Sequence, residues 1–413
     1  MLVACGGGSK ASAPAPTGTA AATAQATPTA DPLGAPAPDG QRAYDIVRKL
    51  AVEIGPRAAG TPAEAAARDA IEALLAGYGY DVTVQEFAFD ASAFLPARVD
   101  AGGDALPAIA LQGSPAGAAT GRVVSAGLGR PGDYPAGGIA GGIALVERGE
   151  IAFAEKARNA LAAGAAGVIV YNNAAGRVLG DLQGPSTIPV VSISQADGEA
   201  LLARVTAGPV EATISVSPPK GTAYNVIAKP KGVARCTTIT GGHYDSVAVT
   251  GGADDNAAGS ASVIETARVA AALRLPGANC FVLFSAEEFG LFGSKAFVQA
   301  MSADDVTALR VMINLDVVGV AQPLELIGSA DMVDTARVVA QKLGLTATPA
   351  ELAKGSGSDH LSFQDAGVPV VMLYRSDPLI HTPADAIDRI EATSLRETVA
   401  VAIGTLQALN AGG

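Results

Sequence analysis

The second half of the chain alternates between short apolar runs and segments whose apolar residues recur at helical spacing. From Tyr224 onward this pattern predicts strands at 237–242, 280–285, 310–316 and 369–374, and helices at 256–273, 291–300, 331–343 and 392–409. Strands separated by helices pair in parallel, because each helix returns the chain to the same end of the sheet. We therefore predict an α/β fold in which a mostly parallel central sheet is sandwiched by helices.

Residues 41–96 are expected to join this sheet from the N-terminal side. Helical spacing indicates a first helix through Tyr44, Val47, Leu50, Ala51 and Ile54. A second helix is predicted to begin after Thr61 as N-cap, with Pro62 in its first position and Glu64 completing a capping box. Apolar residues then alternate with polar ones through 82–87, which predicts a strand.

The segment between these parts is rich in Gly, Ala and short β-branched runs, and it contains no histidine. Strands are predicted at 121–126, 142–147, 167–171 and 188–194, and helices at 152–163 and 195–206. We interpret this segment as a β-rich insertion. The chain then divides into a linker at 1–40, a first domain part at 41–96, the insertion at 97–215 and a second domain part at 216–413.

The first forty residues differ in character from the rest. Leu2-Val3-Ala4-Cys5 is similar to a bacterial lipoprotein cleavage box, in which Cys5 would carry the lipid and tether an exported protein to a membrane. Only four residues precede Cys5, which is too short for a signal peptide, so we interpret the start as truncated. The following Ala, Pro and Thr residues cannot bury enough apolar surface to fold, and we predict a disordered spacer.

The composition limits the kinds of molecule that this chain is expected to bind. The hydrophobic content of 49% describes a globular chain, and no apolar run reaches the roughly 18 residues of a membrane span. The net charge of -12 and the lack of tryptophan argue against nucleic acid, which requires clustered Lys and Arg. The sequence gives no indication of oligomeric state.

Polar residues follow the predicted strands at the points where the strands end. These residues are His243, Asp245, Glu287, Glu288, Asp316 and His381. The carboxyl ends of parallel strands meet at one edge of a sheet, and Asp254 can be turned into the same crevice from the start of a helix. Imidazole nitrogen and carboxylate oxygen are the ligands that catalytic zinc prefers. The sequence therefore predicts a metal site with enough ligands for two zinc ions.

These residues lie in motifs that resemble the ordered signature of the M28 metallopeptidases. The motifs are His243-Tyr-Asp245, Ala253-Asp254-Asp255-Asn256, Ser285-Ala-Glu287-Glu288, Asn314-Leu-Asp316 and His381-Thr382. The resemblance covers residues 41–96 and 220–413, including an N-terminal segment that begins Ile54-Gly-Pro-Arg57. It implies a zinc-exopeptidase fold with two zinc ions per chain.

The resemblance also implies a role for each residue. His243 and Asp316 would bind one zinc ion, Glu288 and His381 would bind the other, and Asp254 would bridge them. Glu287 would be the general base, and Asp245 would fix the tautomer of His243. The Asp254–Asp255 peptide would be cis, as is usual in this family.

Four further residues are assigned less specific roles. Asp255 is interpreted as a supporting or substrate-side group beside Asp254. The family carries a Ser-Asp-His segment near its active site, so Asp359 and His360 are interpreted as supporting or substrate-side groups, with loop hydrogen bonding as the alternative. Tyr374 ends a strand, where it would stabilise a developing oxyanion. A tyrosine of the hydrophobic core is the favoured alternative for Tyr374.

The insertion resembles the protease-associated (PA) domain found in such peptidases. The resemblance is carried by Gly141–Gly149, Phe153–Lys156, Asn159, Ala162–Asn173 and Ile188–Val191. It implies a lid or recognition module without chemistry of its own. A stabilising insert that does not touch substrate remains the alternative.

Two cysteines precede proposed site residues at equal spacing. Cys236 stands seven residues before His243, and Cys280 stands seven before Glu287. If their strands are parallel neighbours, the cysteines fall at matching heights and can form a disulfide, which export to an oxidising compartment would favour. Two buried free thiols are the alternative.

Together these features predict a zinc-dependent exopeptidase that acts on peptides, most simply an aminopeptidase. A glutamate-carboxypeptidase-like enzyme is the rival within the family, although no arginine cluster for an acidic C-terminal residue is evident. Glutaminyl cyclase is a second rival, but it uses a single zinc ion. A binding protein on an inactive peptidase scaffold is the rival from another class, and such proteins lose metal ligands that this chain retains.

Overall fold

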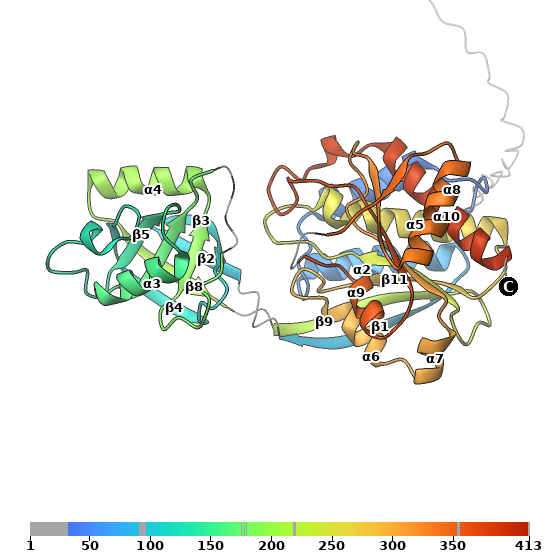
Figure 1. Ribbon diagram of the computed structural model, residues 1–413, viewed down its shortest axis with the longest axis horizontal. Helices are drawn as coiled ribbons and strands as arrows, with labels where there is room; N and C mark the ends of the chain where they lie inside the picture. The colour runs from blue at the N-terminus through green and yellow to red at the C-terminus, as the bar shows by residue number, and fades with distance from the viewer. Residues whose placement is uncertain are drawn as a thin grey trace, which may run out of the picture.

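The computed structural model describes residues 32–90, 96–174, 176, 178, 180–217, 220–352 and 356–411. These residues form two units, a helix-covered sheet and a closed barrel (Figure 1). The proposed lipidation site Cys5 lies outside the described residues. Among the described residues, no helix is both long and apolar enough to cross a membrane.

The larger unit is built on an eight-stranded sheet. In spatial order its strands are β1 (Asp81–Asp90), β9 (Lys220–Lys229), β11 (Asn279–Phe284), β10 (Thr238–His243), β12 (Val311–Leu315), β15 (Val370–Tyr374), β13 (Leu324–Gly328) and β14 (Ala347–Pro349). The four central strands β11, β10, β12 and β15 are mutually parallel, as predicted. The antiparallel pairs involve β1, β9 and β13 at the flanks, and β9, β13 and β14 were not predicted.

Helices cover both faces of this sheet, which confirms the predicted sandwich. One face packs against α1 (Gly40–Arg48), α2 (Pro62–Gly77), α5 (Gly259–Leu273), α8 (Ala330–Lys342) and α10 (Ala392–Ala411). The other face packs against α6 (Phe292–Gln299) and α9 (His360–Asp365), where Phe297 and Phe363 contact Phe284 of β11. The short helix α7 (Ala303–Ala308) follows α6. The apolar face of α1 continues into a π-helical turn at Lys49–Ile54.

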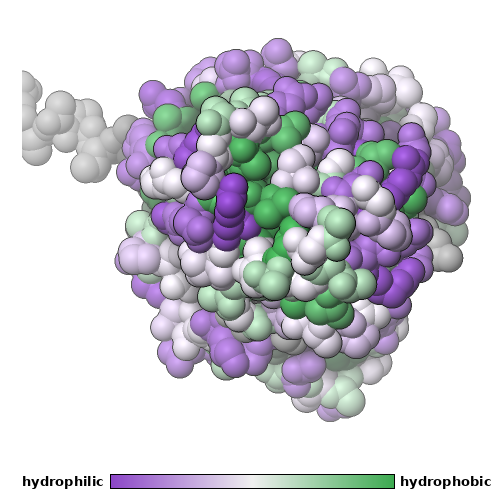
Figure 2. Space-filling view, turned by 90° about the vertical axis from the view of Figure 1, so that its left-hand side faces the viewer, coloured by the Kyte–Doolittle hydropathy of each residue, from purple (hydrophilic) through white to green (hydrophobic). Residues whose placement is uncertain are grey.

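The smaller unit is a closed barrel. Its strands, in order around the barrel, are β2 (Pro96–Ala101), β3 (Asp104–Ala110), β7 (Val190–Ile193), β6 (Gly167–Tyr171), β5 (Ile143–Glu147), β4 (Gly117–Ser125) and β8 (Glu211–Val216). Two helices accompany them, α3 (Phe153–Ala162) and α4 (Gln195–Ala207). Viewed from the barrel end, the surface carries a band of hydrophobic side chains between hydrophilic ones (Figure 2).

The barrel is inserted between two adjacent strands of the sheet. β1 leads towards it and β9 returns from it, paired antiparallel from Asp81 with Lys229 to Asp90 with Lys220 (Figure 1). The side chains of the last pair form an exposed ion pair, with Lys220 Nζ 3.4 Å from Asp90 Oδ2. The chain therefore leaves and re-enters the sheet at neighbouring positions.

The segment 32–39 is attached to the sheet unit, so the predicted spacer over 1–40 is wrong for these residues. The guanidinium of Arg268 on α5 is buried, and it donates to the carbonyl oxygens of Ala35 (2.8 Å) and Ala37 (2.7 Å). Glu265 holds Arg268 at 2.7 Å and also accepts a hydrogen bond from the amide of Asp39. The Asp39 carboxylate then caps α1. Backbone carbonyls that bind a buried cation hold this segment against the sheet unit.

The start of α2 agrees with the sequence only in part. Thr61 is the N-cap, and its hydroxyl accepts a hydrogen bond from the amide of Glu64. The predicted capping box is wrong, because Glu64 turns inward and accepts hydrogen bonds from the hydroxyls of Tyr244 and Ser285. Glu64 is 1% exposed, so its carboxylate forms hydrogen bonds within the protein interior and does not cap the helix.

Cys236 and Cys280 form a disulfide, with their Cα atoms 5.7 Å apart. Their strands are parallel neighbours, as expected. The expected matching heights are wrong, because Cys280 lies opposite Ile239 and Cys236 precedes the first residue of β10. The disulfide joins the start of β11 to the loop that leads into β10, at the end of the sheet remote from the histidines.

Candidate metal centre

The carboxyl ends of the central strands bring the predicted polar residues together. His243 is the last residue of β10, and it is 1% exposed. Glu287 and Glu288 follow β11, and Asp316 follows β12. His381 lies in the loop after β15. Strand order alone explains this meeting, because β11, β10, β12 and β15 are parallel neighbours whose C-terminal ends share one edge.

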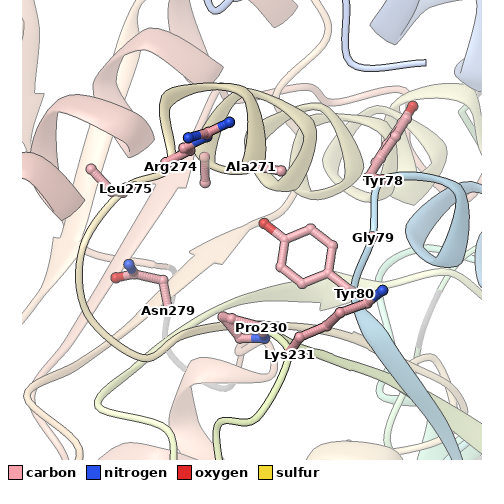
Figure 3. Close-up of a pocket in the computed structure, with 10 residues that line it drawn as sticks. Tyr78, Gly79, Tyr80, Pro230, Lys231, Ala271, Arg274, Leu275 and Asn279 are labelled. Atoms are coloured by element: carbon pink, nitrogen blue, oxygen red, sulfur yellow. The ribbon is translucent and has the colours of Figure 1, made fainter. Parts of the chain in front are cut away.

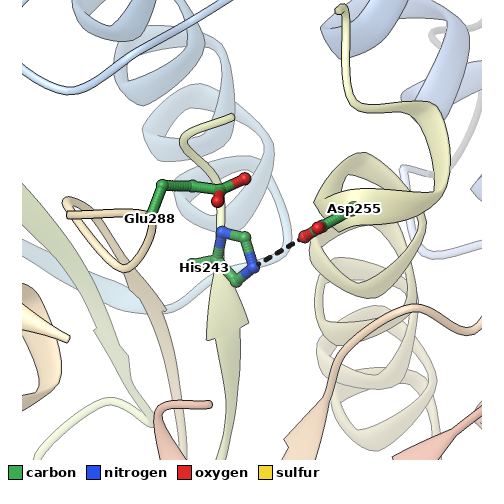
Figure 4. Close-up of side chains that lie close together, drawn as sticks. All are labelled: His243, Asp255 and Glu288. Atoms are coloured by element: carbon green, nitrogen blue, oxygen red, sulfur yellow. Dashed lines mark ion pairs between the residues drawn. The ribbon is translucent and has the colours of Figure 1, made fainter. Parts of the chain in front are cut away.

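Asp255 lies between the two imidazoles. Its Oδ1 is 3.2 Å from Nε2 of His243, as the dashed line in Figure 4 marks, and its Oδ2 is 2.9 Å from Nε2 of His381. Each carboxylate oxygen therefore faces a different histidine. Asp255 enters from the segment that precedes α5, opposite the loop that carries Glu288 (Figure 4).

The structure corrects the prediction that Asp254 occupies this position. The Asp254 carboxylate turns away, and its Oδ1 accepts a hydrogen bond of 2.6 Å from the amide of Gly319. Asp254 is fully buried, and burial raises its pKa well above the ordinary value. The cis peptide also lies one position later than expected, at Asp255–Asn256. The two aspartates are adjacent in sequence, but their side chains point to different surroundings.

The remaining ligand candidates form one group on each side of Asp255. On one side Nε2 of His243 lies 3.4 Å from Asp316 Oδ1 and 3.9 Å from Glu287 Oε2. On the other side Nε2 of His381 lies 3.0 Å from Glu288 Oε2. Ligand atoms of His243, Glu287 and Asp316 fall within 4.8 Å of one another, as do those of His243, Asp255 and Glu288. The site therefore has two adjacent clusters that share His243.

Asp245 lies on the Nδ1 side of the His243 ring, where a residue that fixes the imidazole is expected. Nδ1 of His243 lies 3.2 Å from the carbonyl oxygen of Asp245 and 3.5 Å from its Oδ1. The same carboxylate oxygen accepts a hydrogen bond of 3.2 Å from the amide of Glu287. With Nδ1 directed at these oxygens, Nε2 is left to face the cluster.

The electrostatics of the centre show how strongly the charged groups depend on one another. Burial by itself would lower the pKa of His243, but the carboxylates of Glu287 and Asp316 raise it well above its ordinary value. The Glu288 carboxylate raises the pKa of His381. Burial by itself would raise the pKa of Asp255, but hydrogen bonds from both imidazoles hold it below its usual range. In this arrangement protons on the imidazoles balance the carboxylates.

The pKa values of the two glutamates are raised, in contrast to the pKa of Asp255. Burial raises the pKa of Glu287 well above its ordinary value, and the neighbouring Glu288 and Asp316 carboxylates add to the rise. Burial also raises the pKa of Glu288, with Asp255 contributing. Each glutamate thus sits where its ionised form is costly unless a cation is near.

The donor set fits a pair of divalent cations. Two imidazoles and four carboxylates converge, and within the described ranges no lysine or arginine forms an ion pair with Asp255, Glu287, Glu288 or Asp316. Oδ1 of Asp316 is buried without a hydrogen-bond partner. A buried carboxylate cluster of this kind requires positive charge, which either protons or metal ions supply.

Asp359 and His360 lie beside the centre but not in it. Asp359 is fully buried, and burial raises its pKa to about 7. His360 begins α9 and is 2% exposed, with burial lowering its pKa to about 4. Neither residue belongs to the two clusters. Tyr374 ends β15, where burial raises the pKa of its hydroxyl.

Arg57 lies close to the centre, although the sequence assigned it no role of its own. Its guanidinium is fully buried and donates to the carbonyl oxygens of Tyr244, Gly251 and Gly252. Burial lowers its pKa to about 10, against the opposing effect of nearby carboxylates such as Asp245. Arg57 thus ties the N-terminal Ile54–Gly60 segment to the loop between His243 and Asp255. Its place in the family-like motif was the only signal in the sequence.

A separate cavity lies at the other end of the sheet. It has a volume of about 540 Å³ and opens between α5 and the loop after β9, where Arg274 and Lys231 lie at its border (Figure 3). Tyr80 and Asn279, which precede or begin strands β1 and β11, also line it. Because parallel strands start here, this cavity is remote from the histidine-bearing edge.

A mixed sheet with imidazoles and carboxylates gathered at its carboxyl edge is the arrangement of α/β metallohydrolases. Comparison with known proteins narrows this class. The model of peptidase family M28 matches residues 225–406, and that of the PA domain matches residues 119–201. The chain belongs to peptidase family M28 and carries an inserted PA domain, as its motifs predicted.

Relatives match over most of the chain. Aminopeptidase YwaD of Bacillus subtilis is 34% identical over 386 residues, which cover 86% of this chain and 82% of that protein. A probable lipoprotein aminopeptidase, LpqL of Mycobacterium tuberculosis, is 30% identical, with 87% and 82% covered. The solved structure of BSAP, described as a zinc aminopeptidase from Bacillus subtilis, superimposes with a TM-score of 0.73 at 32% identity, covering 90% of this chain and 95% of that chain.

Proposed function

We propose that this protein is a zinc-dependent aminopeptidase that removes N-terminal residues from peptides at a centre of two zinc ions. The observation that carries the proposal is the position of Asp255, whose two oxygens face His243 and His381 separately. Asp316 would complete the ligands on the His243 side, and Glu288 those on the His381 side. This is the ligand set predicted from sequence, with Asp255 in place of Asp254.

Zinc suits this site because it accepts imidazole nitrogen and carboxylate oxygen together in small coordination shells. When bound, zinc polarises a carbonyl group and lowers the pKa of water towards about 7. The relatives support zinc in particular, since one of the matching structures is described as a zinc aminopeptidase. The deprotonated carboxylates and the neutral imidazoles that zinc requires would replace the proton-balanced network described above.

Glu287 is proposed as the general base. It follows β11 directly, and its amide is fixed by Asp245, so its carboxylate is held 3.9 Å from Nε2 of His243 without being hydrogen-bonded to it. Its raised pKa allows it to take up a proton from attacking water and to release that proton to the leaving amine. Glu288, one residue later, is held by His381 and is less free to exchange protons.

The relatives favour trimming from the amino end. YwaD, LpqL and the structure of BSAP are all described as aminopeptidases, LpqL as a probable one. A carboxypeptidase that recognises an acidic terminus would place an arginine at the substrate, but Arg57 directs its guanidinium at backbone carbonyls. An inactive scaffold is disfavoured because the chain retains the residues proposed as ligands, which are His243, Asp255, Glu288, Asp316 and His381.

The protein is further proposed to act outside the cytoplasm. A disulfide joins Cys236 to Cys280, and disulfides persist in oxidising compartments. The relative LpqL is described as a probable lipoprotein aminopeptidase. A lipid on Cys5 would tether this chain to a membrane in the same manner.

Digestion of a peptide library, with zinc quantified in the same preparation, tests the proposal. We expect about two zinc ions per chain and the loss of residues from the amino end only. Trimming from the carboxyl end would favour the carboxypeptidase, and one zinc ion or none would contradict the proposed centre.

A further inference from the structure

The hydrogen bonds of Asp385 are explained neither by metal binding nor by general-base catalysis. It is 2% exposed, and its Oδ1 accepts a hydrogen bond of 2.7 Å from the amide of Asp254. Its Oδ2 accepts a second bond, of 3.1 Å, from the amide of Asp255. One carboxylate therefore binds two consecutive backbone N–H groups, 131 and 130 residues away in the sequence.

The main chain of Asp385 is fixed as well. Its carbonyl oxygen accepts a hydrogen bond of 2.7 Å from the hydroxyl of Thr250, and that hydroxyl also accepts one of 3.2 Å from the amide of Gly252. Gly252 has a φ of 54°, and a Cβ there would lie 2.1 Å from the carbonyl oxygen of Asp255. The chain that leads into Asp255 is thus held at several points.

We propose that Asp385 is a positioning residue that fixes Asp255 between the two imidazoles. This inference rests on the proposed function, because it concerns the same centre. A carboxylate that accepts from two successive amides sets the plane and direction of the peptide that carries the Asp255 side chain. Both oxygens of Asp385 accept a backbone hydrogen bond, and Asp385 belongs to neither of the two ligand clusters.

The same residue couples two ligands that enter from different elements. Asp385 lies four positions after His381, in the loop that follows β15, whereas Asp255 leads into α5. Nε2 of His381 and Oδ2 of Asp255 are 2.9 Å apart. The hydrogen bonds of Asp385 therefore hold the His381 loop and the Asp255 segment at a fixed separation. Loss of a residue that hydrogen-bonds to a metal ligand typically lowers metal affinity by about 10- to 100-fold.

The test compares Asp385→Asn with the parent protein. The amide NH2 group of asparagine would face one of the two backbone N–H groups, so one hydrogen bond is lost and a repulsive contact replaces it. We expect zinc affinity, measured by competition with a chelator, to fall about 10- to 100-fold. We also expect kcat to fall while KM changes less than about twofold, because the substrate-binding surface is untouched. Asp388→Asn, an exposed carboxylate in the same loop, is the matched control and should match the parent.

A second variant guards against misfolding. Thr250→Val removes only the hydroxyl that donates to the Asp385 carbonyl, and a smaller loss of zinc affinity, about 3- to 10-fold, is expected. If Asp385→Asn binds zinc as tightly as the parent, the inference is overturned, even if this variant is less stable. If Asp385→Asn does not fold, parent-like zinc affinity of Thr250→Val overturns the inference instead. If the parent itself binds no zinc, the proposed function falls and this inference falls with it.

Discussion

The hydroxyl of Tyr244 donates a hydrogen bond to the buried carboxylate of Glu64, across 180 residues of sequence. Tyr244 directly follows His243, and Glu64 lies in the first turn of α2. The same carboxylate accepts a bond of 3.0 Å from the hydroxyl of Ser285, two residues before Glu287. Helix α2 therefore supports the two strand ends that carry the proposed ligand and base.

Glu64→Ala is expected to destabilise the protein substantially. The substitution leaves the hydroxyl of Ser285 without its acceptor in the interior, which costs about 1–3 kcal/mol, whereas the hydroxyl of Tyr244 keeps the carbonyl oxygen of Tyr224 at 2.7 Å. Denaturant unfolding of the metal-free protein measures the change. Glu72→Ala, on the same helix but only half-buried, is the control and should change the free energy of unfolding by less than about 0.5 kcal/mol. Equal effects of both substitutions would show that the buried contacts of Glu64 contribute little.

Asp255→Asn and Asp254→Asn distinguish the two adjacent aspartates. Asp255→Asn replaces one of the oxygens between the imidazoles with an amide nitrogen, which cannot bind zinc, so we expect it to lose most bound metal. Asp254→Asn keeps an oxygen that can accept from Gly319, so bound metal should stay close to the parent level. Zinc content after dialysis measures both. Loss of zinc in Asp254→Asn alone would return the bridging role to the residue that the sequence suggested.

Glu287→Gln is expected to retain zinc and to lose hydrolysis by about 100- to 10,000-fold, the usual contribution of a general base. The glutamine keeps the shape of the side chain but cannot accept a proton. Release of nitroaniline from aminoacyl-nitroanilides measures the rate, and Glu86→Gln, exposed on β1, serves as control. Parent-like hydrolysis by Glu287→Gln would remove this residue from the role of base.

The metal-free protein should become less stable as pH rises above neutrality. The pKa values of His243 and His381 are raised, so their contribution is fully present below the unfolded value of about 6.5 and is lost as pH rises through the folded values. Glu287 and Glu288, whose pKa values are also raised, act in the same direction as they ionise. We expect the unfolding temperature of the metal-free protein to fall between about pH 6.5 and 9.

Zinc should abolish this decline, because metal charge replaces the protons that balance the carboxylates. Thermal unfolding at several pH values, with chelator or with zinc, gives the comparison. A metal-free protein whose unfolding temperature stays level over this range would contradict the proton-balanced network.

The sequence predicted the centre of the fold well, because parallel strands buried on both faces carry an uninterrupted apolar signal. The run at 280–285 became β11 at Asn279–Phe284, and the run at 369–374 became β15 at Val370–Tyr374. β13 and β14 were missed because they are short and lie towards one edge of the sheet, beyond β15. In the barrel, β2, β3 and β8 were missed because their alternation of small residues is weak.

The candidate site was predicted as a set but not in every detail. Placement at strand ends identified His243, Glu287, Asp316 and their neighbours, since that depends only on strand order. The difference between Asp254 and Asp255 involves hydrogen bonds that both backbone amides donate to the distant carboxylate of Asp385, which sequence spacing does not encode. The role of Glu64 was predicted wrongly for a related reason. Its spacing from Thr61 fits a capping box, and the sequence does not show that the distant Tyr244 lies near it.

The paired entry and exit of the barrel bear on how this architecture can be rearranged. Neighbouring strands are about 5 Å apart, so the insertion spans a gap between β1 and β9 that a tight turn could also span. A short hairpin in its place would close the same two strands at Asp90 and Lys220 without disturbing their register. The peptidase unit and the PA domain can therefore be exchanged, lost or acquired as separate modules.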